Sequence, residues 1–173
     1  MANSPPVTRA DLFAALAQLG IATTTVEHPA VFTVAESDAL ARDITGGHTK
    51  NLFLKDARGE LFLIVAEAHT AVDLRGLHKA LGCARLSFGN AALLAEVLGV
   101  TPGSVTAFAA INDRMARVTF IVDTALMAHR DINCHPLVNT ATTTIGRDDL
   151  IRFLTSTGHP PRILGLGTPA SGS

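Results

Sequence analysis

Aromatic and charged residues are scarce in this sequence. It contains no tryptophan and no tyrosine, and only 17% of its 173 residues are charged. The formal net charge of -1 argues against a protein that coats nucleic acid through a large basic surface, although it leaves room for a small phosphate-binding patch. Hydrophobic residues make up 47% of the chain, which is enough to bury the core of one domain.

Cysteines are few, and no apolar run is long. Cys83 and Cys134 are far apart and form no CxxC pair, so we expect a reducing compartment without a disulfide framework or a structural zinc site. No run reaches the roughly 18 apolar residues of a membrane span, and the segment "MANSPPVTRADL" lacks the basic and apolar regions of a signal peptide. We therefore expect a cytoplasmic protein without a membrane partner.

The motifs of several enzyme classes are also missing. There is no HExxH pattern, no GxSxG nucleophile elbow and no P-loop. The seven histidines are scattered and show no paired Cys/His spacing. We therefore expect no metal site and no cofactor.

Helical periodicity, capping residues and stop signals predict five helices. They cover residues 8–19, 33–44, 74–82, 91–98 and 147–158. The expected capping residues are Thr8 with Asp11, Thr33 with Glu36, Asp73 and Asn90.

Runs rich in β-branched and apolar residues predict the strands. They cover residues 21–28, 50–56, 60–66, 83–88, 104–113, 117–123 and 135–146. The second and third form a hairpin with Gly59 in its turn. Because helices alternate with hairpin-like connections, we expect a single compact α+β domain with a mixed or antiparallel sheet, followed by a loosely held tail.

A lysine stands at the head of the strand predicted over residues 50–56. The two-residue period of a strand puts Lys50, Leu52 and Leu54 on one face, and Asn51 and Phe53 on the other. If the first face is internal, the Lys50 ammonium is partly desolvated and needs an anionic or carbonyl partner. A surface lysine that extends its ammonium to water is the alternative.

The segment "GVTPGSVT", from Gly99 to Thr106, is rich in glycine and precedes a predicted strand. Such a loop can bring backbone N–H groups close to a ligand oxygen, as an oxyanion or phosphate site requires. A plain turn explains the same glycines and Pro102 without any ligand.

The segment "NCHPLVN" places a His-Pro turn before a threonine-rich strand. His135 can donate to a substrate oxygen or orient a water molecule, and Asn139 can supply a neutral hydrogen bond. A structural histidine is the alternative.

In order along the chain, four segments resemble the YbaK/prolyl-tRNA synthetase-associated editing domains, and most closely the free-standing bacterial prolyl-tRNA editing proteins. The segments are "HPAVFTVAES", "TKNLFLKD", "LGVTPGSVTAFAAIND" and "CHPLVNTATTTI". The resemblance covers residues 8–160 and leaves 1–7 as an extension and 161–173 as a tail.

The resemblance implies a barrel-like mixed sheet and hydrolysis, without a metal, of the ester between a wrong amino acid and tRNA. The expected substrate is the acceptor end of tRNA(Pro) carrying alanine, and prolyl-tRNA synthetase is a possible partner of a monomer or weak dimer. Lys50 matches the family's central lysine, whose role is to anchor the substrate or to assist hydrolysis. The expected substrate contacts are Val31, Phe32, Asn51, Gly103, Ser104, Val105, His135 and Asn139.

Two features keep alternatives open. Ala107 stands where related domains often have the proline of a Gly-x-x-x-Pro motif, so an inactive tRNA-binding module of the same fold is one alternative. A deacylase for another small amino acid, or for a small aminoacyl ester without tRNA, is another. Val31 and Phe32 can wall a small pocket that excludes larger amino acids, or they can pack in the core.

Overall fold

A computed structural model describes residues 5–30 and 34–167 of the chain. The α-helices are α1 (Arg9–Gln18), α2 (Val34–Asp43), α3 (Leu77–Leu81), α4 (Ala91–Leu98) and α5 (Arg147–Ser156). The short 3-10 helices are η1 (Pro102–Ser104), η2 (Ala107–Asn112) and η3 (Thr124–Ala128). The strands are β1 (Thr23–Glu27), β2 (Gly47–Asp56), β3 (Leu61–Glu67), β4 (Leu86–Phe88), β5 (Val118–Asp123), β6 (Asp131–Cys134), β7 (Ala141–Gly146) and β8 (Arg162–Leu164).

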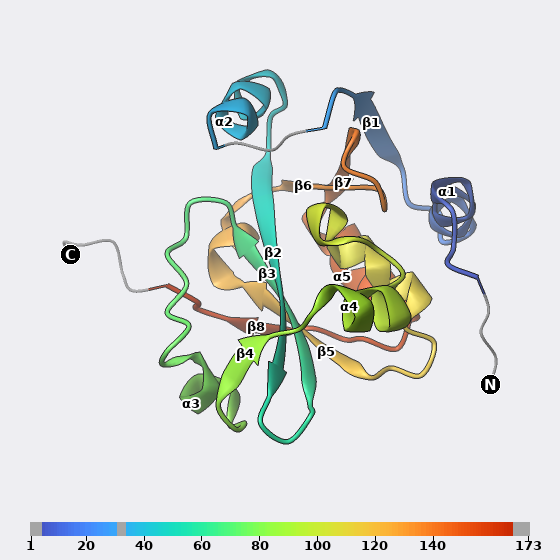
Figure 1. The fold of residues 1–173 in the computed structure, drawn as a ribbon. Helices are drawn as coiled ribbons and strands as arrows, with labels where there is room; N and C mark the ends of the chain where they lie inside the picture. Colours follow the sequence, from blue (N-terminus) through green and yellow to red (C-terminus); the bar gives the residue numbers. More distant parts are fainter. Residues whose placement is uncertain (1–4, 31–33, 168–173) are drawn as a thin grey trace.

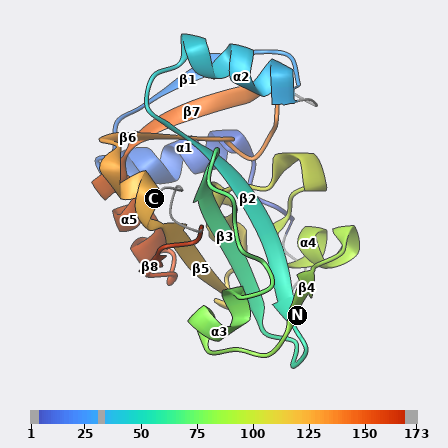
Figure 2. The ribbon, with the colours of Figure 1, turned by 90° about the vertical axis from the view of Figure 1, so that its left-hand side faces the viewer.

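The long strand β2 runs through the middle of a mixed sheet (Figure 1). The described strands follow the order β1-β7-β6-β2-β3-β5-β8, and β4 pairs with β2 outside this path. Pairing is parallel between β2 and β6, β3 and β5, and β5 and β8, and antiparallel elsewhere. Figure 2 shows β1, β7 and α2 at one end of β2, and α3 and β4 at the other. The predicted α+β domain with a mixed sheet is confirmed.

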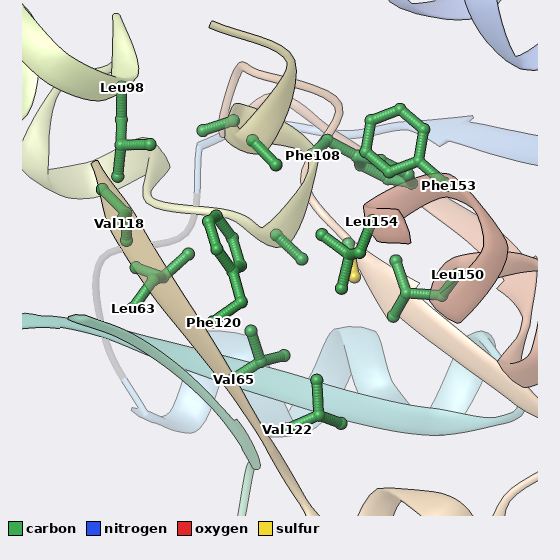
Figure 3. Close-up of a cluster of buried hydrophobic side chains, with 14 of the residues drawn as sticks. Leu63, Val65, Leu98, Phe108, Val118, Phe120, Val122, Leu150, Phe153 and Leu154 are labelled. Carbon is green, nitrogen blue, oxygen red and sulfur yellow. The ribbon is translucent and has the colours of Figure 1, made fainter. Parts of the chain in front are cut away.

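Alternate residues of the β2–β3 hairpin pack into two hydrophobic clusters. Phe53, Leu63 and Val65 belong to the larger cluster, which α4, η2 and α5 cover (Figure 3). Leu54 and Ile64 belong to a smaller cluster with residues of α3. Because neighbouring side chains of a strand point to opposite faces, the hairpin is buried on both sides.

Several local predictions are confirmed. Thr8 and Asp11 form the expected capping box of α1. Asn90 caps α4 by accepting a 2.8 Å hydrogen bond from the Leu93 N–H. Gly59 lies in the hairpin turn with φ of 88°, a conformation in which a residue without a Cβ meets no steric penalty. The predicted cap Thr33 lies outside the described residues.

The strand predicted over residues 104–113 is wrong. These residues form the end of η1 and all of η2, and Ala107, Phe108, Ala109 and Ala110 are buried in the larger cluster. A short apolar run has the same composition in a buried strand and in a buried helix turn, so its periodicity does not separate the two.

Further predictions fail at element ends, and the strand predicted over residues 135–146 begins only at Ala141, as β7. Asp73 does not cap α3, which begins at Leu77 with Gly76 at its N-cap; the Asp73 carboxylate instead accepts from the Gly76 N–H. The strand predicted over residues 83–88 is limited to β4. In each place a turn shortens the regular element.

The C-terminal segment is not a loose tail as far as residue 167. Strand β8 pairs with β5, and Val72 forms an isolated bridge with Gly167. Leu166 is buried in the smaller cluster. Edge pairing and burial of one leucine therefore attach this segment to the sheet.

Candidate functional site

Strand β2 carries Lys50 at its fourth residue, because the strand begins earlier than predicted, at Gly47. Lys50 is half-buried and pairs with Ala66 of β3. Leu52 and Leu54 pack with the smaller cluster while Phe53 packs with the larger one. Strand alternation therefore places Lys50 on the side of the leucines, as predicted.

The sheet is interrupted beside Lys50. Strand β3 pairs with one side of β2 from Thr49 to Lys55. On the other side, β6 pairs only with Gly47 and His48, and β4 pairs only from Leu54 onward. The edge of β2 from Thr49 to Leu52 thus has no strand partner on that side among the described residues. We call this edge the sheet gap.

The His135 turn lies level with the sheet gap. In the parallel register Gly47 pairs with Ile132 and His48 with Asn133. Continuing that register by two residues brings Lys50 level with His135, just after β6 ends at Cys134. The strands stop pairing at His48 and Asn133, so this register gives the order of the residues along the gap and not a contact between Lys50 and His135.

His135 has a defined tautomer. Its Nδ1 lies 3.2 Å from the carbonyl oxygen of Ala141, which can only accept, so Nδ1 carries the proton and Nε2 keeps a lone pair. Burial lowers the pKa of His135, an effect that the Ala141 hydrogen bond opposes and that nearby His28 reinforces. The ring is therefore neutral at pH 7 and presents an acceptor.

The same turn reaches the glycine-rich loop. A Cβ atom on Gly103 would lie 3.2 Å from Nδ2 of Asn139, so the two predicted site residues are in contact. Between His135 and Asn139, Leu137 adopts a φ of 70°, which is rare for a branched residue and is held by a 2.9 Å bond from the Leu137 N–H to the His135 carbonyl. The loop and the turn therefore form one unit.

The glycine-rich loop has fewer free donors than the sequence suggests. The Ser104 N–H donates to the Thr101 carbonyl at 2.8 Å and is not available to a ligand. Val105 is half-buried against the larger cluster. Ala107 is the first residue of η2, where Thr106 accepts from the Phe108 N–H, so a capping side chain stabilises the loop at the position of the missing proline.

Asn51 carries an unsatisfied buried atom. Its Oδ1 is buried and accepts no hydrogen bond from the part of the chain that the structure describes. A buried acceptor without a donor lowers the stability of the folded protein by about 1–3 kcal/mol. A ligand that supplies the missing donor would explain why an asparagine stands at this position. Asn51 follows Lys50 in the part of β2 that borders the sheet gap, but its side chain leaves the opposite face of the strand, the side of Phe53.

A second feature lies at the far end of β2. A cavity of about 640 Å³ is lined by Leu54, Leu74, Arg75, His78, Arg85, Leu86, Ser87 and Phe88. Leu54 lies on the same face of β2 as Lys50, and Phe88 is 59% exposed. None of the lining residues is acidic, so the cavity combines cationic groups with an exposed aromatic ring.

The two cysteines are poor nucleophiles. Burial raises the pKa of the Cys134 thiol to about 12, although a hydrogen bond with Thr49 opposes this. Burial and nearby Asp56 also raise the pKa of Cys83. Both groups are thiols at neutral pH, and only the thiolate attacks an ester efficiently.

The structure also adds a histidine that the sequence analysis did not select. His28 Nδ1 donates to the Pro29 carbonyl, and Nε2 lies 2.8 Å from Oγ1 of Thr142. The His28 N–H donates to the Thr140 carbonyl, next to the His135 turn. The two His-Pro segments begin 107 residues apart in the sequence. The pairing of β1 with β7 brings them close together in the fold. Val31 and Phe32 lie outside the described residues.

Comparison with known proteins gives the family. Residues 28–153 match the model of a family described as the aminoacyl-tRNA editing domain. The chain belongs to this family. The matched range contains Lys50, the glycine-rich loop and the His135 turn, so the editing domain includes every part of the site described above.

Two curated relatives are similar over most of their length. A zebrafish (Danio rerio) protein named prolyl-tRNA synthetase associated domain-containing protein 1 is 40% identical over 165 residues, covering 94% of this chain and 90% of the relative. The prolyl-tRNA editing protein ProX of Acetoanaerobium sticklandii is 32% identical over 149 residues, covering 86% and 91%.

A solved structure has the same fold. It is described as a candidate trans-editing enzyme for prolyl tRNA synthetase, and it superposes with a TM-score of 0.69 and 20% identity over 96% of this chain and 99% of the other. The described part of the editing domain contains no helix that is both long enough and apolar enough to cross a membrane.

Proposed function

We propose that this editing domain hydrolyses alanyl-tRNA(Pro) in trans, after prolyl-tRNA synthetase has released the mischarged tRNA in the cytoplasm. The observation that carries the proposal is the sheet gap, where Lys50 and the acceptor of Asn51 both lack partners among the described residues. An aminoacylated adenosine offers an ammonium and hydroxyl groups as donors, and carbonyl and phosphate oxygens as acceptors. Its phosphate or carbonyl oxygens can accept from the Lys50 ammonium, and its hydroxyl groups are donors of the kind that the Asn51 acceptor on the other face of β2 lacks.

Recognition of a wrong amino acid explains why such a site is useful. A synthetase pocket built for proline excludes the smaller alanine weakly, because a few lost apolar contacts are worth only about 1–3 kcal/mol. A second site that hydrolyses small esters removes the error. Val31 and Phe32 remain our candidates for the residues that exclude larger amino acids from it.

The proposed reaction needs only water as the nucleophile. Water attacks the ester carbonyl, the bond from that carbon to the ribose oxygen breaks, and the ribose oxygen takes a proton, giving alanine and free tRNA. The lone pair on His135 Nε2 can accept a hydrogen bond from the attacking water or a ribose hydroxyl. We propose that the backbone N–H groups of Gly103 and Val105 donate to the oxyanion that develops on the ester. The Ser104 N–H is not a candidate, because it donates to the Thr101 carbonyl.

An assay across substrates tests the proposal against its alternatives. We expect rapid hydrolysis of alanyl-tRNA(Pro) and little hydrolysis of prolyl-tRNA(Pro). Faster hydrolysis of cysteinyl-tRNA(Pro) would identify a deacylase for another amino acid. Binding of alanyl-tRNA(Pro) without hydrolysis would identify an inactive binding module, and equal cleavage of a free alanyl ester would show that tRNA is not part of the substrate.

The rate should depend on the protonation of His135. Because burial lowers its pKa, the ring stays neutral to below about pH 6.5, the ordinary histidine value. We expect kcat/KM for alanyl-tRNA(Pro) to be level near pH 7 and to fall only as pH drops through this lowered pKa. His135→Asn should be slower and should lose the acidic limb of the pH profile. A wild-type limb centred above pH 6.5 would contradict the assignment.

The cavity beside β4 is our candidate for contact with the tRNA outside the sheet gap. Arg75 and Arg85 form no ion pair within the described structure, and phosphate is the anion that an acceptor stem presents. The double variant Arg75→Ala/Arg85→Ala should weaken tRNA binding and flatten the plot of log K against log salt by about 1–2 units of slope. Arg114→Ala, an exposed arginine in the turn before β5, is the control. An unchanged slope in the double variant would remove the cavity from the binding surface.

A further inference from the structure

Asn133 of β6 lies at the point where β2 leaves its parallel neighbour. Its side chain is buried, with 2% of the residue exposed. Nδ2 lies 3.0 Å from the carbonyl oxygen of Thr45 and 3.5 Å from that of Gly47, and Oδ1 accepts from the Thr144 hydroxyl. Carbonyl oxygens only accept, so these partners fix which end of the amide is nitrogen.

The backbone of Asn133 extends the same set of contacts. Its carbonyl accepts a 2.8 Å hydrogen bond from the Thr49 hydroxyl. His48 Nε2 lies 3.4 Å from Asn133 Nδ2, but it donates to the Ile44 carbonyl at 2.7 Å and therefore does not accept from the amide. One residue thus holds positions 45, 47 and 49 of the segment that leads to Lys50.

We propose that Asn133 is a positioning residue for Lys50. The expected effect on catalysis rests on the proposed function. The expected effect on the position of Lys50 does not depend on that function. The ladder between β2 and β6 has only two residue pairs, Gly47 with Ile132 and His48 with Asn133. Immediately after them the sheet gap begins, so the Asn133 contacts are the last anchors of β2 on that side before Lys50.

The turn before β2 is shaped to fit this anchor. Gly46 has a φ of 107°, and a Cβ atom there would lie 2.9 Å from the Asp131 carbonyl oxygen and 3.1 Å from Asn133 Nδ2. The Gly46 backbone therefore packs directly against the Asn133 amide, and no side chain fits at position 46. A rotated Asn133 amide would lose its contacts with the Thr45 and Gly47 carbonyl oxygens, and Lys50 follows only three residues after Gly47.

Thr144 offers a mild way to test the positioning role. Thr144→Val keeps the shape of the side chain but removes the hydroxyl that orients Asn133, whereas Thr144→Ser keeps the hydroxyl. Asn133→Ala removes the anchor itself. The matched control is Asn112→Ala, another asparagine whose amide joins two backbone segments, the Val7 N–H and the Leu98 carbonyl, away from β2.

Lys50 can be observed directly because the chain has only three lysines, Lys50, Lys55 and Lys79. After reductive ¹³C-methylation, we expect the Lys50 NMR signal to move or broaden in Thr144→Val and Asn133→Ala, while the Lys55 and Lys79 signals stay in place. Thr144→Ser should keep the wild-type spectrum. Asn112→Ala should lower the melting temperature without changing the Lys50 signal.

Kinetics gives the second readout. In single-turnover hydrolysis of alanyl-tRNA(Pro), Thr144→Val should lower the rate by about tenfold or more, because small displacements of a reacting group are costly, and Thr144→Ser should restore it. Unchanged Lys50 signals in folded Thr144→Val and Asn133→Ala would overturn the inference. If the wild-type protein hydrolyses no aminoacyl-tRNA while the spectra change as expected, the proposed function fails and the positioning role stands.

Discussion

Replacing Lys50 with alanine is expected to lower kcat/KM for alanyl-tRNA(Pro) hydrolysis by about a hundredfold or more, the usual effect of removing a preorganised charged or polar contact from an active site. Lys50 is half-buried beside the sheet gap and pairs with no acidic residue in the described structure. Its ammonium is therefore free to bind a phosphate or carbonyl oxygen of the substrate. The measurement is a single-turnover rate with labelled alanyl-tRNA(Pro), together with a Kd for the uncharged tRNA.

Two further variants make the Lys50 result specific. Lys79→Ala removes an exposed lysine of α3 and should leave the rate unchanged. Lys50→Arg keeps the charge but replaces a compact ammonium by a wider planar group, so it should restore binding more than it restores hydrolysis. Full activity in Lys50→Ala would show that the lysine lies outside the site.

Replacing Asp113 with alanine is expected to lower the free energy of unfolding by about 3–5 kcal/mol, because it leaves a buried polar partner uncompensated. The Asp113 carboxylate accepts from His159 Nε2 at 2.8 Å and from the N–H groups of Arg117 and Val118 at 3.0 and 2.8 Å. These contacts join the end of η2 and the start of β5 to the segment before β8. In a protein of this length the loss corresponds to about 10 °C in Tm.

The pH dependence of stability provides an independent check on Asp113. Burial raises the pKa of its carboxyl, but the His159 and backbone hydrogen bonds outweigh burial and lower it overall. A carboxylate with a lowered folded-state pKa contributes stability that is present above the unfolded value of about 3.9 and is lost as pH falls through the folded value. Asp113→Ala should lose this component of acid denaturation. The exposed Asp38→Ala is the control, and equal Tm values for the two variants would contradict the expected role of Asp113.

Local sequence signals predicted the parts of the fold that depend on nearby residues. The α1 capping box, the Asn90 cap and the turn at Gly59 each involve residues within four positions of one another, and all three are present. Strand β6 was not predicted, because Asp131–Cys134 is short and polar at two of its positions. Its neighbours are β2 and β7, and pairing with β2 joins residues 85 positions apart, which no local pattern reveals.

The candidate site shows the same limit. Strand alternation placed Lys50 with Leu52 and Leu54, and the family resemblance pointed to the Gly103 loop and the His135 turn. The sheet gap was not predictable, because it arises where two strands from distant parts of the chain stop pairing with β2. For the same reason the sequence did not predict that β2 begins at Gly47, where pairing with β6 and the Asn133 amide hold the strand.

The proposed deacylation is tested by the rate at which the purified protein hydrolyses alanyl-tRNA(Pro), compared in parallel with prolyl-tRNA(Pro) and with the uncatalysed ester. We expect the alanyl ester to be cleaved far faster than it decays alone and the prolyl ester to be spared. An alanyl ester that decays at the uncatalysed rate in the presence of the protein, under conditions in which the tRNA binds, would contradict the proposed deacylation.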